Sequence, residues 1–154
     1  MIKIYFAGSI RGGRQDAEWY FELLQLLRRH GRVLSEHVAD PEVHAKERRL
    51  TDRQIFQQDL RWIRQADAVV AEVTTPSLGV GYELGYAEAL KIPALCLYSG
   101  ASPSGLSAMI SGSYYYEHNI INYQKGDTEA VAKILDSFFN ESVLQPRPGN
   151  SVAL

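Results

Sequence analysis

Five short apolar runs, separated by segments with helical periodicity, constrain the fold of this chain most. The runs lie at residues 2–7, 32–36, 67–73 and 93–98 and, less clearly, near 118–123. The sequence Ala-Val-Val-Ala at 68–71 is apolar at every position, which is typical of a parallel strand covered by helices on both faces. Strands that alternate with helices predict a doubly wound α/β fold.

Four helices can be placed between and after these runs, three of them from apolar stripes or capping residues. The first helix should bury a face made of Ala17, Tyr20, Phe21, Leu24 and Leu27. The second should begin with the capping box of residues 51–54 and end near Ala66, with an apolar stripe of Ile55, Phe56, Leu60 and Ile63. A short helix is expected within 106–110. Asp127 is the expected N-cap of a last helix over 128–139.

The length and composition predict one domain over residues 1–139 and a mobile tail over 140–154, which contains two prolines and little pattern. A net charge of −2 provides no broad basic field, so nucleic acid and anionic membranes are not expected partners. No apolar stretch is long enough to span a bilayer. The chain starts without a signal-peptide pattern, and its single cysteine, Cys96, lies in an apolar run, so we expect a cytoplasmic protein.

The ligand crevice of a doubly wound sheet lies beyond the carboxyl ends of its strands, so the segments that follow strands are the candidate sites. The segment after the first strand can cradle a phosphate, because its glycines let backbone N–H groups approach an anion while Ser9 and Arg11 add donors. It has neither the Walker A nor the dinucleotide-binding spacing, and a flexible strand-to-helix turn is the alternative. The segment consists of Gly8, Ser9, Ile10, Arg11, Gly12, Gly13 and Arg14.

Two carboxylates are candidates for catalysis. Glu83 is expected in the first turns of a helix that starts near Gly79, where the helix dipole favours the ionised form and the glycines leave room for a ligand. An ordinary glutamate matched to the dipole is the alternative. Asp59 should lie at the edge of an apolar stripe, where a paired or solvent-facing aspartate is also possible. Glu72 ranks lower, because its side chain can point to the opposite face of the sheet.

His37, after the second strand, can contact a base or sugar or act as an acid, and a structural histidine is the alternative. The remaining histidines and Cys96 have no metal-ligand spacing. We therefore predict neither a metal site nor a cofactor.

Six ordered motifs resemble those of the 2′-deoxynucleoside 5′-phosphate N-hydrolases, a group within the nucleoside 2-deoxyribosyltransferase superfamily. The motifs lie at residues 5–13, 36–38, 58–60, 66–73, 76–85 and 106–110. The resemblance implies a single flavodoxin-like domain with a five-stranded parallel sheet flanked by helices. It also implies a homodimer that hydrolyses the N-glycosidic bond of a 2′-deoxynucleoside 5′-monophosphate, with the base and 2-deoxyribose 5-phosphate as products.

The same resemblance implies a role for each candidate residue. Glu83 would attack C1′ and form a covalent glycosyl-enzyme, Asp59 would contact the sugar or assist departure of the base, and Tyr5 would position Glu83 and the sugar. The implied phosphate-binding residues are the seven of the first loop with Ser77, Gly79 and Ser107. The implied sugar- and base-binding residues are Tyr20, His37 and Met109. Ser107 and Met109 would reach the site of the neighbouring subunit.

Three other functions remain open on the sequence. A nucleoside 2-deoxyribosyltransferase would use the same glutamate and pass the sugar to a second base, although Ser9, Arg11, Ser77 and Ser107 are better explained by a phosphorylated substrate. A CMP-type ribonucleotide N-glycosidase is possible because no residue decides the 2′ position. A nucleotide sensor without turnover is the third, and the presence of both Asp59 and Glu83 weighs against it.

Overall fold

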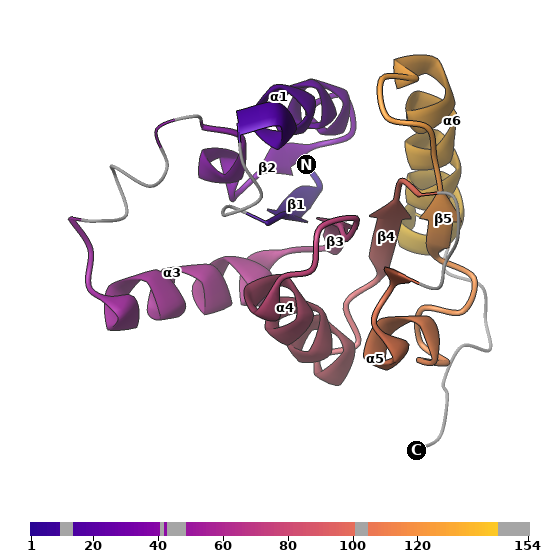
Figure 1. The fold of residues 1–154 in the computed structure, drawn as a ribbon. Coiled ribbons are helices and arrows are strands. Elements are labelled where there is room, and N and C mark those ends of the chain that lie inside the picture. Colours follow the sequence, from indigo (N-terminus) through magenta and orange to yellow (C-terminus); the bar gives the residue numbers. More distant parts are fainter. Residues whose placement is uncertain (10–13, 41, 43–48, 101–104, 145–154) are drawn as a thin grey trace.

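A computed structural model describes residues 1–9, 14–40, 42, 49–100 and 105–144 of the chain. Its five strands form one all-parallel sheet in the order β2-β1-β3-β4-β5 (Figure 1). This is the flavodoxin-like order that the resemblance implied, and the order reverses between β1 and β3. The strands are β1 (Lys3–Ala7), β2 (Arg32–Val33), β3 (Ala68–Glu72), β4 (Ala94–Tyr98) and β5 (Ile120–Asn122).

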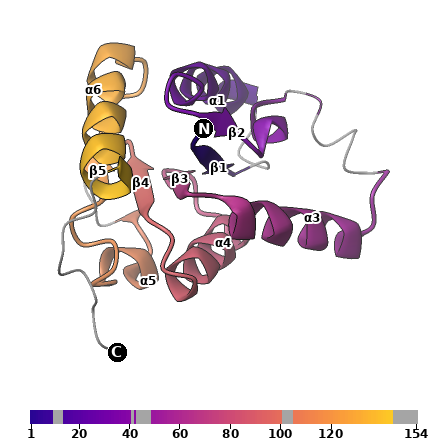
Figure 2. The ribbon, with the colours of Figure 1, turned by 180° about the vertical axis from the view of Figure 1, so that it is seen from behind.

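Helices cover both faces of the sheet: α1 and α6 lie on one side, and α3 and α4 on the other (Figures 1 and 2). The alternation of side chains along each strand divides the core accordingly. Phe6 and Val70 face α1 and α6, whereas Tyr5 and Val69 face α3 and α4. The helices are α1 (Arg14–Leu27), α3 (Asp52–Gln65), α4 (Leu78–Ala89), α5 (Ala108–Ser111) and α6 (Thr128–Phe138), with a 3₁₀ turn, η1 (Glu36–Ala39), and a π-helical turn, η3 (Phe139–Leu144).

The structure contains the helix caps of α3 and α6 and the buried cysteine that were predicted from the sequence. Thr51 and Gln54 form the predicted capping box at the start of α3, and the Asp127 side chain accepts the Ala130 N–H at the start of α6. Cys96 is buried in β4, and this burial raises the pKa of its thiol to about 12. Within the described ranges, no helix is both long and apolar enough to cross a bilayer.

The second strand is shorter than predicted, because the expectation of a strand over 32–36 was wrong after Val33. The Ser35 hydroxyl accepts the Phe6 N–H at 2.8 Å and donates to the Phe6 carbonyl at 2.7 Å. A side chain therefore replaces the backbone ladder at this point, and the chain turns into η1. As a result, His37 lies on a 3₁₀ turn beyond the strand.

Two aromatic residues predicted to be buried are half exposed. Phe21 is 52% exposed, and Leu23 fills the core beneath α1 in its place. Phe56 is 48% exposed because α3 buries only Leu60 and Ile63, while its N-terminal part extends beyond the strands (Figure 1).

A π-helical turn follows α6 directly. Residues 139–144 form η3, and Phe139 is buried with its ring stacked on His30 at 4.5 Å. The predicted tail is thus helical from 140 to 144, and its remaining residues, 145–154, lie outside the described ranges.

We expect Thr51→Ala to lower the free energy of unfolding by about 1 kcal/mol, because it removes the oxygen that accepts the Gln54 N–H in the capping box. Urea denaturation followed by circular dichroism measures the change. Thr51→Ser keeps the hydroxyl and should stay close to wild type. An equal loss in both variants would show that the cap is not the cause.

Candidate active site

A hydrogen bond between Tyr5 and Glu83 forms the centre of the candidate site. The Tyr5 hydroxyl donates to Glu83 Oε1 at 2.8 Å, across 78 positions of sequence. Tyr5 is buried on β1 with its ring toward α3 and α4, and Glu83 lies in the second turn of α4. The parallel pairing of β1 with β3, which leads into α4, brings the two residues together.

The Glu83 carboxyl is unusual because burial raises its pKa to about 7. The Tyr5 hydrogen bond stabilises the ionised form and opposes this rise, while the negative charge of Asp59 adds to it. The sequence analysis expected the helix dipole to keep Glu83 ionised. That effect fades beyond the first turn, and burial outweighs it here.

Asp59 lies on α3, which packs beside α4 against the same face of the sheet (Figure 1). Its side chain is partly buried, and its charge acts on Glu83. The two predicted carboxylates are therefore neighbours in space although 24 positions separate them in the sequence. Two carboxylates in one site can take different protonation states, because each one disfavours ionisation of the other.

The glycines around Glu83 do not share one role. Residues four apart lie on the same helix face, so Gly79 is on the side of Glu83, whereas Gly81 and Gly85 lie on another side. A Cβ at Gly79 would approach only Ser77 Oγ, at 3.8 Å, and Cβ atoms at Gly81 and Gly85 would meet nothing within 4 Å. Gly79 therefore leaves room on the side of α4 that carries Glu83. Gly81 and Gly85 leave room on a different side of this helix.

The predicted phosphate-binding residues lie at the carboxyl edge of the sheet. Ser9 follows β1 and is buried, and its N–H donates to the Tyr20 hydroxyl at 3.1 Å. Ser77 is the N-cap of α4, where its side chain accepts the Val80 N–H. Gly8 is required for packing, because a Cβ there would come within 3.0 Å of the Tyr20 ring.

Part of the predicted phosphate loop cannot be placed. Four of its residues lie outside the described ranges, namely Ile10, Arg11, Gly12 and Gly13. Arg14 is the first residue of α1.

The three residues predicted to bind the sugar or base occupy different environments. Tyr20 is buried beneath Ser9, with its ring in the core on the α1 side of the sheet. His37 is partly buried and lies against Trp62, with 5.2 Å between ring centroids. Its burial lowers the pKa of the imidazole and favours the neutral form. Met109 is 86% exposed on α5.

Ser107 is the N-cap of α5, and its hydroxyl accepts the Met109 N–H at 3.3 Å. Among the hydrogen bonds of the described residues, none joins Ser107 or Met109 to the Tyr5–Glu83 pair. Their roles stay predictions.

Glu72 is a buried polar residue whose hydrogen-bond network could not be predicted from the sequence. It faces α1 and α6, as the alternation with Val70 requires, so it points away from Glu83. This orientation confirms the reason for its low rank as a catalytic candidate. Glu72 is nevertheless buried and accepts hydrogen bonds from Tyr20, Tyr123 and Thr74. Tyr20 and Tyr123 are 52 and 51 positions away from Glu72 in the sequence, so no local pattern could reveal them.

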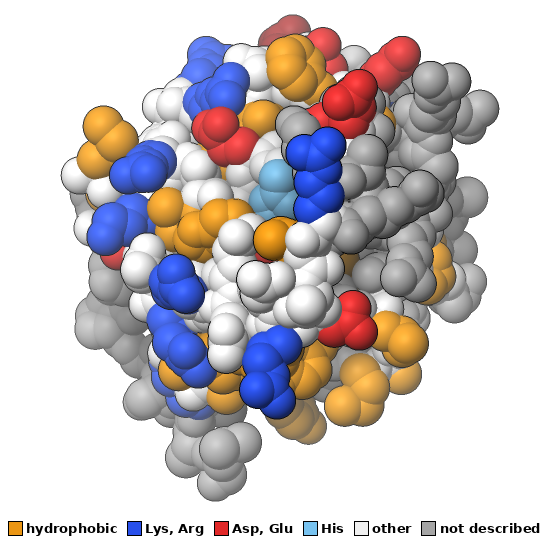
Figure 3. Space-filling model, turned by 90° about the vertical axis from the view of Figure 1, so that its left-hand side faces the viewer, with side chains coloured by type: hydrophobic (Ala, Val, Ile, Leu, Met, Phe, Trp, Pro, Cys, Tyr) orange, Lys and Arg blue, Asp and Glu red, His pale blue; other side chains and the backbone are white. Residues whose placement is uncertain are grey.

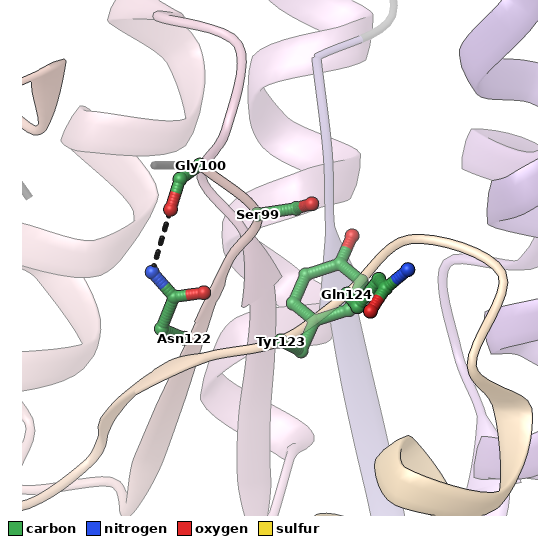
Figure 4. A pocket seen from close by; sticks show the side chains of 5 residues that line it. All are labelled: Ser99, Gly100, Asn122, Tyr123 and Gln124. Atoms are coloured by element: carbon green, nitrogen blue, oxygen red, sulfur yellow. Dashed lines mark hydrogen bonds between the residues drawn. The ribbon is translucent and has the colours of Figure 1, made fainter. Parts of the chain in front are cut away.

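Two surface pockets lie away from the Tyr5–Glu83 pair. One, of about 370 Å³, is at the carboxyl ends of β4 and β5, where Asn122 Nδ2 donates to the Gly100 carbonyl (Figure 4). Its lining is Ser99, Gly100, Asn122, Tyr123 and Gln124. The other, of about 410 Å³, is on α3. Its lining is Phe56, Gln57, Leu60, Arg61 and Arg64.

We expect the Glu83 carboxyl to titrate near pH 7 when it is followed by ¹³C NMR with labelled glutamate. Tyr5→Phe should raise this midpoint because it removes the hydrogen bond that favours the carboxylate, and Asp59→Asn should lower it because it removes a negative charge. The raised pKa stabilises the fold below the ordinary value of 4.5, and that contribution is lost as the pH rises through 7. A shift in the same direction in both variants would contradict this account.

Known proteins resemble the chain over most of its length. A profile of the nucleoside 2-deoxyribosyltransferase family matches residues 4–128. The 5-hydroxymethyl-dUMP N-hydrolase of Rattus norvegicus is 47% identical over 151 residues, which cover 96% of this chain and 91% of the relative. The human protein of that name is 49% identical over 139 residues, covering 88% and 78% of the two chains.

Two further proteins, one of them much more distant in sequence, also resemble the chain. A Trichoplax adhaerens protein provisionally named 2′-deoxynucleoside 5′-phosphate N-hydrolase 1 is 44% identical, over 93% of this chain and 96% of its own. The solved structure of a CMP N-glycosidase from Clostridium botulinum shares the fold, with a TM-score of 0.62 and 17% identity over 88% of this chain and 98% of its own. The identity to the N-hydrolases and the match over 4–128 confirm the resemblance: the chain belongs to the nucleoside 2-deoxyribosyltransferase family and groups with its N-hydrolase members.

Proposed function

We propose that this protein hydrolyses the N-glycosidic bond of 2′-deoxynucleoside 5′-monophosphates to a free base and 2-deoxyribose 5-phosphate. The observation that carries this proposal is the partly buried Glu83 carboxyl, held by the Tyr5 hydroxyl and influenced by the charge of Asp59. The substrate class is supported by the N-hydrolase names of relatives at 44–49% identity. Because two relatives are named for 5-hydroxymethyl-dUMP, that nucleotide is the first substrate to assay.

In the proposed reaction, a Glu83 carboxylate oxygen forms a bond to C1′ while the bond from C1′ to the base nitrogen breaks and its electron pair leaves with the base. Tyr5 engages Oε1, so Oε2 is the oxygen available to attack. Water then attacks C1′ while the bond from C1′ to the Glu83 oxygen breaks, which restores the carboxylate and releases 2-deoxyribose 5-phosphate. The proton that the water loses balances the proton that the departing base takes up. Asp59 either contacts the sugar or assists departure of the base.

The phosphate is proposed to bind between the first loop and the start of α4. Backbone N–H groups at a helix N-terminus favour an anion, and Ser77 and Gly79 begin this helix. The Ser9 N–H already donates to Tyr20, so Ser9 would contribute its hydroxyl. This binding supplies energy that orients C1′ toward Glu83.

A homodimer is part of the proposal, because α3 and α4 present an apolar surface suited to a second copy of the chain. Leu78 is 98% exposed and Tyr82 57% exposed, and Tyr82 lies 6.0 Å from the half-exposed Phe56 ring. Gly81 and Gly85 continue this face of α4 and let another helix approach closely. On the side of the molecule shown in Figure 3, Lys and Arg side chains lie among exposed hydrophobic side chains. Across this interface, Ser107 and Met109 are proposed to reach the partner's site.

We expect Glu83→Gln to reduce base release on the order of a thousandfold or more, because an amide cannot replace the nucleophilic carboxylate. Chromatography of the free base measures the reaction. Glu88→Gln is the matched control, with the same substitution on the same helix, and should keep near-wild-type activity. Full activity of Glu83→Gln would exclude the mechanism.

The choice of substrate separates the proposal from the alternatives. Purified protein is incubated with 5-hydroxymethyl-dUMP, dGMP, GMP, and deoxyguanosine with and without adenine. Base release from the deoxynucleotides supports hydrolysis. Exchange of guanine for adenine would instead indicate a transferase, and tight binding without product would indicate a sensor.

A mixed-dimer assay tests whether Ser107 acts in the neighbouring site. Ser107→Asp keeps an N-cap residue but places a negative charge against the phosphate, so it should be nearly inactive, as should Glu83→Gln. If Ser107 reaches the partner, mixing the two variants restores roughly a quarter of wild-type activity, since mixed dimers hold one intact site. No recovery, with subunit exchange verified by native mass spectrometry, would place Ser107 in its own site.

A further inference from the structure

A buried carboxylate, Glu72, lies on the opposite face of the sheet from Glu83. Tyr123 donates its hydroxyl proton to Glu72 Oε1 at 3.1 Å, and Tyr20 donates to Oε2 at 3.5 Å. The Thr74 hydroxyl and backbone N–H also donate to Oε1. Donors from α1, from the turn after β3 and from the end of β5 thus converge on one carboxylate.

The same donors also hold backbone groups at the carboxyl edge of the sheet. The Tyr20 oxygen accepts the Ser9 N–H at 3.1 Å, and the Thr74 oxygen accepts the Ser99 N–H at 2.8 Å. Trp19 Nε1 donates to the Tyr123 oxygen at 2.7 Å. Figure 4 shows Ser99 and Tyr123 at the ends of neighbouring strands. Glu72 therefore connects the ends of β1, β3, β4 and β5 through single hydrogen-bonded side chains.

Packing alone does not explain a carboxylate at this position. The preceding residue on the same face of β3 is Val70, which fills the core without any polar group. A buried carboxylate is costly unless several donors satisfy it. Its side chain also points to the side of the sheet opposite Tyr5 and Glu83, so it does not face the candidate site.

What Glu72 does connect is the pair of segments proposed to bind the phosphate. Tyr20 fixes Ser9 at the start of the first loop, and Thr74 begins the turn that leads to Ser77 and α4. Both segments must keep a fixed separation to enclose a phosphate. A rigid bridge beneath them would set that separation before the substrate arrives, which lowers the ordering cost of binding.

We propose that Glu72, with Tyr20 and Thr74, positions the two halves of the 5′-phosphate pocket from beneath, without touching the substrate. This inference rests on the proposed function, which places the phosphate between the first loop and the start of α4. Tyr20 would then serve as a support for Ser9, in place of the sugar or base contact that the sequence suggested.

Two phenol-to-phenyl variants form a matched pair. Tyr20→Phe and Tyr123→Phe each remove one buried hydroxyl that donates to Glu72, but only the Tyr20 hydroxyl also holds Ser9. We expect Tyr20→Phe to raise the KM for the nucleotide roughly fivefold with kcat within about twofold, as the loss of one neutral hydrogen bond in a binding loop predicts. Tyr123→Phe should leave KM close to wild type.

Thr74 provides a second pair. Thr74→Val removes the hydroxyl that joins Glu72 to the Ser99 N–H and should raise KM, whereas Thr74→Ser keeps that hydroxyl and should restore the wild-type value. Thermal unfolding of all four variants separates the effect from general destabilisation. If Tyr20→Phe does not fold, the two Thr74 variants still test whether the Glu72 network positions the phosphate pocket.

Calorimetric titration with 2-deoxyribose 5-phosphate keeps this test independent of turnover. Absence of base release by the wild-type protein would refute the proposed function, and titration would still report on phosphate binding. A dissociation constant that rises in Tyr20→Phe and Thr74→Val, but not in Tyr123→Phe and Thr74→Ser, supports the positioning role. Equal changes within either pair, or a loss of kcat at constant KM, would overturn it.

Discussion

The burial of β3 on both faces and along both edges is the constraint on which the rest of the structure depends. β1 and β4 pair with its two edges in parallel, and every residue from Ala68 to Glu72 is buried. Such a strand must divide its side chains strictly between the two helical layers. The division sends Val69 and Ala71 toward α3 and α4, and Val70 and Glu72 toward α1 and α6.

Glu72 at the end of this strand and Glu83 on the helix that follows it consequently meet opposite environments. Glu72 is surrounded by donors, which compensate its carboxylate for the loss of water. Burial raises the pKa of Glu83 to about 7, the nearby charge of Asp59 adds to this rise, and the hydrogen bond from Tyr5 opposes it. The first environment suits a support, and the second suits a group that must react.

A single copy of the chain leaves much of the α3–α4 layer uncovered. Leu78 and Tyr82 are exposed on the helix that carries Glu83, and the two pockets described above do not include that residue. A second copy packed on this layer would cover the apolar side chains and enclose the space beside Glu83. This arrangement links the proposed homodimer to the proposed chemistry, since one helix, α4, carries both the apolar face and Glu83.

The α/β class, the caps of α3 and α6, and the position of Glu83 on a helix after the third strand could all be predicted from the amino-acid sequence. These features follow from local patterns, because capping and strand or helix periodicity are set by residues a few positions apart. The ordered motifs also identified the family, which the comparisons confirmed.

Only the tertiary structure decided which side chains meet. It ended β2 at Val33 through the Ser35 hydroxyl, joined Tyr5 to Glu83, and gathered Tyr20, Thr74 and Tyr123 around Glu72. These contacts join segments up to 78 positions apart, and the pKa of Glu83 depends on the burial that they create. Local sequence patterns do not specify which distant residues will be neighbours, so the environment of each carboxylate could be described only from the folded chain.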